Sequence, residues 1–231
     1  MTRTASRTAE LARRLSAELL GTALLVTVVV GSGIAAERLS PHDVGLQLLE
    51  NSLVTGAALV ALILALQPVS ASFNPVVTLV ERAFGLVTSL DVLVLVGAQV
   101  AGACVGAVVA NLMFGLDAVS RSTTERTGGG LLLGEVVATF GLLIVIFGTL
   151  RSGRTENVAF AVGGYITAAY FFTSSTSFAN PAVTVARTLS DTFAGIDPAA
   201  VPMFVLMQLL GGALALGLLL LLRSGPVRTE P

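Results

Sequence analysis

The sequence has no tryptophan, no lysine, one cysteine and one histidine, and charged residues make up only 12% of it. With Cys104 alone no intrachain disulfide can form, and with His42 alone there is no cluster of ligands for a metal ion. No nucleophile is paired with a base, which argues against an enzyme and against a bound cofactor. A soluble domain carries about 25% charged residues. Because 54% of the 231 residues are hydrophobic, we expect an integral membrane protein.

Six stretches are long and apolar enough to cross about 30 Å of hydrocarbon. They cover residues 15–35, 48–66, 91–114, 131–150, 158–172 and 202–222. Two further segments, 75–85 and 181–193, reach only about 15–20 Å, which is half of a bilayer. Arginine-rich residues precede the first stretch, and we expect that stretch to be retained as a membrane span and not cleaved as a signal peptide.

An Asn-Pro motif stands at the start of each short segment. The first reads SFNPVVT (residues 72–78) and the second SFANPAVT (residues 177–184). Asparagine caps the N-terminus of a helix well, and proline fits the first helical position because it has no N–H to leave unpaired. A helix that begins inside the membrane directs its free N–H groups and its positive end toward the bilayer centre. The motifs therefore predict two half-helices, with Asn74 and Asn180 meeting at the centre of a polar pathway.

The two halves of the chain repeat the same motifs in the same order. Glu18-x-x-x-Thr22 matches Glu135-x-x-x-Thr139, Asn74 matches Asn180, and Gln99-x-x-Gly102 matches Gln208-x-x-Gly211. Each half holds three spans, so the second half is inserted upside down, an arrangement that places a solute site near the midplane. We expect one membrane domain over residues 1–231, with repeats at about 11–114 and 131–223 and an external linker at 115–130.

Arginine residues are distributed unequally between the two predicted sides of the membrane. Nine lie on the side of the N-terminus: Arg3, Arg7, Arg13, Arg14, Arg82, Arg151, Arg154, Arg223 and Arg228. Four lie on the other side: Arg38, Arg121, Arg126 and Arg187. Basic residues favour the cytoplasmic side, so we expect both termini to be cytoplasmic.

These motifs closely resemble those of the major intrinsic proteins, the aquaporin and aquaglyceroporin family, and the resemblance covers nearly the whole folded chain. It implies an all-α membrane protein with six transmembrane helices and two re-entrant half-helices. It also implies a homotetramer in the lipid bilayer of a bacterial inner membrane, with water and small neutral solutes as partners and no nucleic acid. The pore would be marked by the motif residues Asn74, Pro75, Val76, Asn180, Pro181 and Ala182, with the amide groups of both asparagines aimed into the lumen.

The sequence departs from the family pattern at the expected selectivity filter. Typical members carry arginine three residues after the second asparagine, where this chain has Val183. The other filter positions carry over to Thr55 (or Val54 if no gap is allowed), Ala168 and Ser177. None of these side chains is aromatic or basic, so we expect a wide, arginine-free filter that passes glycerol-like polyols. In addition, Val76 replaces the usual alanine of the first motif and places a branched side chain near the meeting point of the half-helices.

Three charged residues have roles that the resemblance suggests. Glu18 and Glu135 lie within spans, and we interpret them as structural acceptors for the irregular backbone before each half-helix, in preference to proton relays. Arg187 lies seven residues after Asn180. It either lines the outer vestibule, where it would attract anions, or forms an i, i+4 pair with Asp191.

The residues around the second motif also resemble a bacterial subgroup of aquaglyceroporins that occurs with arsenic-resistance genes. That resemblance implies passage of arsenite or methylated arsenicals, and arsenous acid is a neutral, glycerol-like solute. The competing interpretation is a secondary transporter, since transporters also use inverted repeats and broken helices.

Overall fold

The computed structural model describes residues 2–222, with side chains from residue 7 onward. Arg223 and Arg228, which entered the count of arginines, lie outside the described residues, as does the side chain of Arg3. The described chain is helical and contains no strand. The first half holds α1 (Thr2–Leu39), α2 (Val44–Leu66), α3 (Pro75–Ala83) and α4 (Ser89–Met113). The second half holds α5 (Gly129–Arg151), α6 (Val158–Phe172), α7 (Pro181–Ala186) and α8 (Val201–Leu221), with the short 3₁₀ turns η1 (Thr155–Asn157), η2 (Arg187–Leu189) and η3 (Pro198–Ala200).

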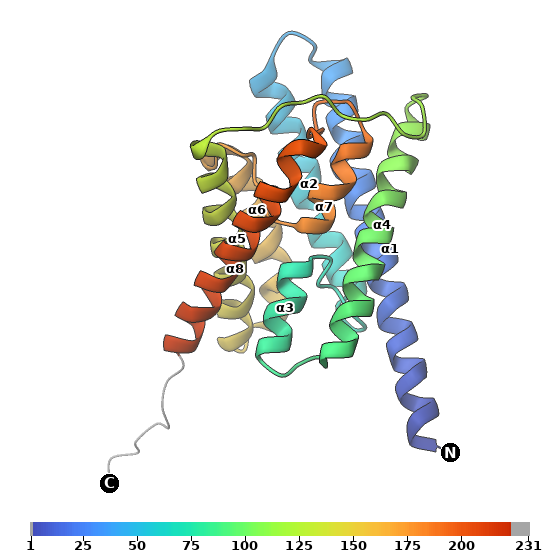
Figure 1. Ribbon diagram of the computed structural model, residues 1–231, viewed down its shortest axis with the longest axis vertical. Coiled ribbons are helices and arrows are strands. Elements are labelled where there is room, and N and C mark those ends of the chain that lie inside the picture. The colour runs from blue at the N-terminus through green and yellow to red at the C-terminus, as the bar shows by residue number, and fades with distance from the viewer. Residues whose placement is uncertain (1, 223–231) are drawn as a thin grey trace.

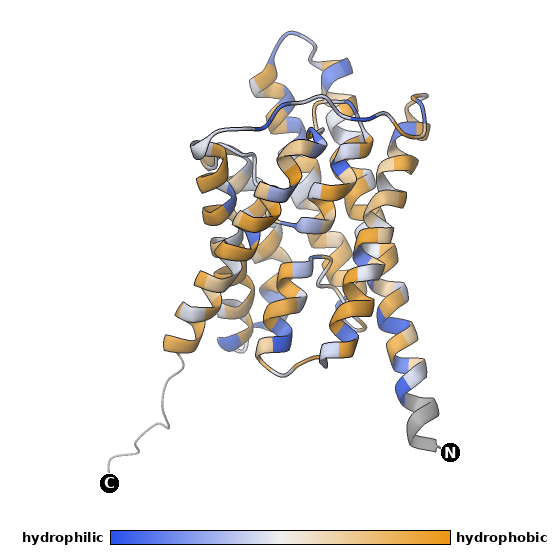
Figure 2. Cartoon of the chain, in the orientation of Figure 1, coloured by the Kyte–Doolittle hydropathy of each residue, from blue (hydrophilic) through white to orange (hydrophobic). Residues whose placement is uncertain are grey.

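The long helices form a bundle around the two short ones (Figure 1). Helices α1, α2, α4, α5 and α8 are each long and apolar enough to span a membrane, and α6 adds a shorter helix of 15 residues. Hydrophobic residues run along most of the helix lengths, while hydrophilic residues gather in the linker over the top and near the lower end of α1 (Figure 2). The start of α1 and the end of α8 lie at the same end of the bundle, called here the inner end (Figure 1). The linker between α4 and α5 crosses the outer end.

Close helix contacts depend on glycines at matching positions in the two halves. A side chain on Gly102 of α4 would place its Cβ 2.2 Å from the Leu19 carbonyl oxygen of α1. A side chain on Gly211 of α8 would place its Cβ 2.5 Å from the Val136 carbonyl oxygen of α5. Small residues let membrane helices approach in this way because packing, and not the hydrophobic effect, holds them together in lipid. Helices α1 and α4 form one tight pair, and α5 and α8 form the other. The two half-helices lie between these pairs, in contact with α4 and α8.

The half-helices α3 and α7 point in opposite directions from the middle of the bundle (Figure 1). Helix α3 packs against α8 as well as against α4, and α7 packs against α4 as well as against α8, so each half-helix contacts both repeats. The second half-helix is shorter than the predicted segment 181–193. It ends at Ala186 and continues as the 3₁₀ turn η2, because Ser190 has an extended backbone with φ −138° that stops further helical turns.

Candidate pore

The asparagine of each motif caps the N-terminus of its half-helix. Asn74 has an extended backbone, and its Oδ1 accepts a hydrogen bond of 2.9 Å from the backbone N–H of Val76. Asn180 is also extended, and its Oδ1 accepts from the N–H groups of Ala182 and Val183 at 3.0 and 3.3 Å. Pro75 and Pro181 fill the first helical positions. The caps therefore satisfy N–H groups that would otherwise be unpaired at the centre of the bundle.

The two asparagines also cross-link the two halves. The Asn74 side-chain nitrogen donates to the carbonyl oxygen of Ala179 at 2.8 Å, and the Asn180 nitrogen donates to the carbonyl oxygen of Phe73 at 2.7 Å. Phe73 and Ala179 both adopt left-handed backbone conformations with φ 48°. An amide NH₂ group has two hydrogens, so each asparagine keeps a second donor. Because both residues also line the central cavity, that second donor is available to a solute.

Glu18 and Glu135 hold the loops that lead into the half-helices. Both oxygens of Glu18 are occupied: they accept from Ser70 Oγ, from the backbone N–H groups of Ser72 and Phe73, and from Gln99 Nε2. Glu135 accepts in the same manner from the N–H groups of Phe178 and Ala179 and from Gln208 Nε2. The two glutamines donate in turn to Thr78 and Thr184 of the half-helices. Both carboxylates thus bind irregular backbone, the geometry that a structural role requires.

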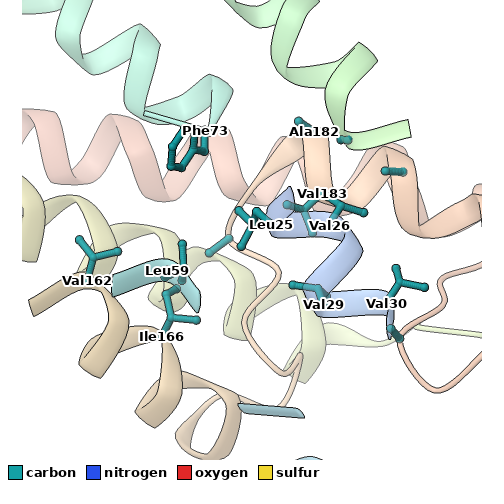
Figure 3. Packing of buried hydrophobic residues seen from close by; sticks show 14 of the residues in the cluster. Leu25, Val26, Val29, Val30, Leu59, Phe73, Val162, Ile166, Ala182 and Val183 are labelled. Atoms are coloured by element: carbon teal, nitrogen blue, oxygen red, sulfur yellow. The ribbon is translucent and has the colours of Figure 1, made fainter. Parts of the chain in front are cut away.

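A single cavity of about 450 Å³ runs from the inner end past both asparagines to the outer part of the bundle. One wall carries the asparagines and the irregular loops before α3 and α7. The facing wall is apolar and includes Leu59 of α2 with Val162 and Ile166 of α6, which lie near one another in Figure 3. The cavity therefore has a hydrogen-bonding side and a hydrophobic side along its length.

The outer end of the cavity contains three of the four predicted filter residues. Thr55, Ser177 and Val183 are buried and line the cavity, whereas Val54 is exposed on α2. Ser177 Oγ has no hydrogen-bond partner among the described residues. These three residues, which the family resemblance suggests, therefore face the cavity, with Thr55 and not Val54 on α2.

Ala168, the fourth predicted filter residue, does not line the cavity. It is exposed on the outward face of α6, whereas Ile166 and Tyr170 of the same helix line the cavity. Residues four apart share a helix face, and Ala168 lies two residues from each, on the opposite side. On this helix Tyr170, and not Ala168, therefore faces the cavity, and its hydroxyl group lies 3.3 Å from Thr55 Oγ1.

Arg187 lines the same outer end and is 2% exposed. Its guanidinium lies over the ring of Phe178, 3.4 Å from the ring centroid, and its Nε donates to the carbonyl oxygen of Ala194. The predicted alternative, a pair with Asp191, is wrong: Asp191 follows η2 in a loop and accepts from the N–H and hydroxyl group of Thr123. Position 183 has no arginine, but Tyr170 and Arg187 place an aromatic and a basic side chain at the outer end. Arg187 thus lies at the outer end, the first of the two roles expected for it, and Tyr170 adds an aromatic side chain that is not among the four predicted filter residues.

Val76 of the first motif lies away from the cavity. Its side chain packs in a cluster with Val77, Leu143 and Ala215 and is 2% exposed. A Cβ on Gly212 of α8 would lie only 2.4 Å from Val76 Cγ1, so the glycine leaves the space that the valine fills. The branched side chain therefore does not narrow the meeting point of the half-helices.

Comparisons with known proteins agree with this architecture. The sequence matches the family model "Major intrinsic protein" over residues 5–175 and again over 151–230. It is 50% identical over 211 residues to the aquaglyceroporin AqpS of Rhizobium meliloti (strain 1021), covering 91% of this chain and 90% of the relative. It is 32% identical over 151 residues to aquaporin Z of Photorhabdus laumondii, covering 59% of this chain and 64% of that protein. The fold is similar to that of the aquaglyceroporin from Plasmodium falciparum, with a TM-score of 0.68 at 18% identity, covering 90% of this chain and 94% of that chain.

Proposed function

The chain belongs to the major intrinsic protein family, and from this premise we propose that it is a passive pore whose solutes include glycerol-like polyols and arsenous acid as well as water. It is a multi-pass membrane channel for water and small solutes, not an enzyme. The observation that carries the proposal is the two-sided cavity. The free N–H groups of Asn74 and Asn180 can donate to hydroxyl groups on one side, while Leu59, Val162 and Ile166 offer contacts for carbon on the other.

A small polyol suits such a cavity better than an ion does. Its hydroxyl groups can accept from the two asparagines in turn, and its carbon chain can contact the apolar wall without losing hydration. An ion would lose far more hydration free energy in a lumen with so few polar groups. Arsenous acid, a neutral molecule with three hydroxyl groups, presents the same donors and acceptors as glycerol.

Purified protein in proteoliposomes tests this proposal directly. Stopped-flow light scattering would compare the uptake of water, glycerol and arsenous acid with that of protein-free vesicles. We expect all three solutes to enter faster with the protein, at rates that do not respond to imposed proton or sodium gradients. Flux that depends on such a gradient would favour a secondary transporter, and water flux without glycerol flux would contradict the proposed solute range.

We further propose that the channel is a homotetramer in a bacterial inner membrane with both termini in the cytoplasm. Large apolar side chains are exposed on the described surface, including Leu46, Leu49 and Leu53 of α2. Neighbouring subunits and lipid would cover them. Light scattering of the purified protein, with the detergent contribution subtracted, gives the mass that tests the tetramer. Protease accessibility of tags placed at each terminus, measured in inverted vesicles, tests the orientation.

A further inference from the structure

Two residues of opposite charge occupy equivalent places in the two halves of the pore. Glu81 lies seven residues after Asn74, and Arg187 lies seven residues after Asn180. Seven residues are nearly two helical turns, so each charge lies about 10 Å from its asparagine on the same face. Because α3 and α7 point in opposite directions, Glu81 lies toward the inner end and Arg187 toward the outer end. Both residues line the cavity that passes the two asparagines.

The fold uses only part of the Glu81 carboxylate. One oxygen accepts from Ser72 Oγ at 2.9 Å, and the other is buried without a hydrogen-bond partner among the described residues. Glu18 and Glu135 differ in this respect, because each binds the backbone through both oxygens. Glu10 and Arg14, which carry opposite charges, line the same inner mouth. Glu81 is thus a lumen-lining acid that no structural contact fully occupies.

The remaining electrostatic features of the pore favour anions. Arg187 donates to a backbone carbonyl, and no carboxylate within residues 7–222 forms an ion pair with it. The positive ends of the two half-helices meet at the centre of the cavity, beside Asn74 and Asn180. An anion that enters from the outer end therefore meets a guanidinium and then two positive helix ends. Glu81 is the first lumen-lining group after them that repels it.

We infer that Glu81 is a specificity-determining residue of the channel, which blocks anions at the inner end of the lumen while Arg187 blocks cations at the outer end. The inference rests on the proposed function, since it requires a conducting pore. The two charges stand at separate places along one path, so an ion of either sign is attracted at one end and repelled at the other. Neutral solutes experience neither barrier.

Planar lipid bilayers containing the purified channel in a potassium nitrate gradient provide the test. Wild-type protein should give no conductance above that of protein-free bilayers. Glu81→Gln should give a nitrate conductance at least tenfold above that of protein-free bilayers, with a reversal potential near that of an anion-selective pore. Glu156→Gln is the matched control, because Glu156 is exposed in η1, outside the cavity. Adding Arg187→Gln to Glu81→Gln should abolish the preference for nitrate over potassium.

Glu81→Ser is a second neutral variant that keeps a hydroxyl group near Ser72, in case the glutamine variant does not fold. Folded Glu81→Gln or Glu81→Ser protein without nitrate conductance would overturn the inference, and so would wild-type protein that conducts nitrate. A failure of the proposed function itself would look different. In that case wild-type proteoliposomes would show no facilitated water or glycerol flux at all.

Discussion

The hydroxyl group of Tyr170 lies 3.3 Å from Oγ1 of Thr55 and joins α6 to α2 at the outer end of the cavity. Both residues are buried and both line the cavity. An aromatic ring thus stands at the level where the sequence predicts only small side chains. Because the Tyr170 ring and Arg187 both line this end of the cavity, substitutions here test most directly which sizes of solute can pass.

We predict that Tyr170→Ala increases glycerol flux several-fold, because it removes an aromatic ring from the outer end of the lumen. Tyr170→Phe keeps the ring and loses only the hydrogen bond to Thr55, so its effect should be much smaller. Stopped-flow uptake into proteoliposomes, normalised to the amount of folded protein, measures both variants. Equal glycerol flux in Tyr170→Ala and wild-type protein would show that the ring does not limit passage.

Val183→Arg should reduce glycerol and arsenous acid flux about tenfold or more while affecting water flux less. Val183 lines the cavity one helical turn before Arg187, so a second guanidinium there would fill the lumen from the same wall. Val183→Met adds length without charge and separates the effect of bulk from that of charge. If glycerol flux through Val183→Arg protein matches that of wild type, position 183 lies outside the narrow part of the pore.

Gly212→Ala should destabilise the protein by about 1–3 kcal/mol, the usual cost of overpacking a buried site. The added Cβ would lie 2.4 Å from Val76 Cγ1, and neither α8 nor α3 can move without disturbing other contacts. The double variant Val76→Ala/Gly212→Ala should regain most of the lost stability, because it removes the clashing methyl groups. Thermal unfolding in detergent, followed by intrinsic tyrosine fluorescence or by size-exclusion chromatography, gives the comparison. Additive losses in the double variant would show that the two positions do not interact.

Glu135→Gln should also lower stability, in this case through lost hydrogen bonds. The carboxylate accepts from two backbone N–H groups and from Gln208 Nε2, and an amide has only one oxygen to offer them. A buried donor left without an acceptor costs about 1–3 kcal/mol. Glu156→Gln, on the exposed turn η1, serves as the control. A Glu135→Gln protein that unfolds at the wild-type temperature would contradict the structural role.

The elements that the sequence predicts well are those fixed by local chemistry. Each Asn-Pro pair sets the start of a half-helix through the cap, whatever surrounds it. The predicted span 158–172 coincides with α6, because polar residues border an apolar run at that point. Ser177 begins the second motif, which positions it in the cavity, whereas Thr55 lies in no motif and is found there as the family resemblance implies.

The features that the sequence does not predict depend on how a helix is rotated about its own axis and on contacts between residues far apart in the sequence. Helix α6 is apolar on all sides, so no polar stripe marks which face meets the lumen, and Ala168 and Tyr170 cannot be told apart by pattern. The position of Arg187 depends on the Ala194 carbonyl and the Phe178 ring, which the chain supplies from an aperiodic loop and from the segment before α7. Neither contact leaves a periodic signal.

The crossed bonds of Asn74 and Asn180 have a consequence for synthesis of the chain. Asn74 finds its acceptor 105 residues later, and the Phe73 carbonyl finds its donor 107 residues later. While the ribosome is making α4 these groups have no partner, and lipid supplies none. These two hydrogen bonds can therefore form only after the second motif has been synthesised. A chain truncated after α4 would lack both partners, the Ala179 carbonyl oxygen for Asn74 and the Asn180 amide for the Phe73 carbonyl oxygen.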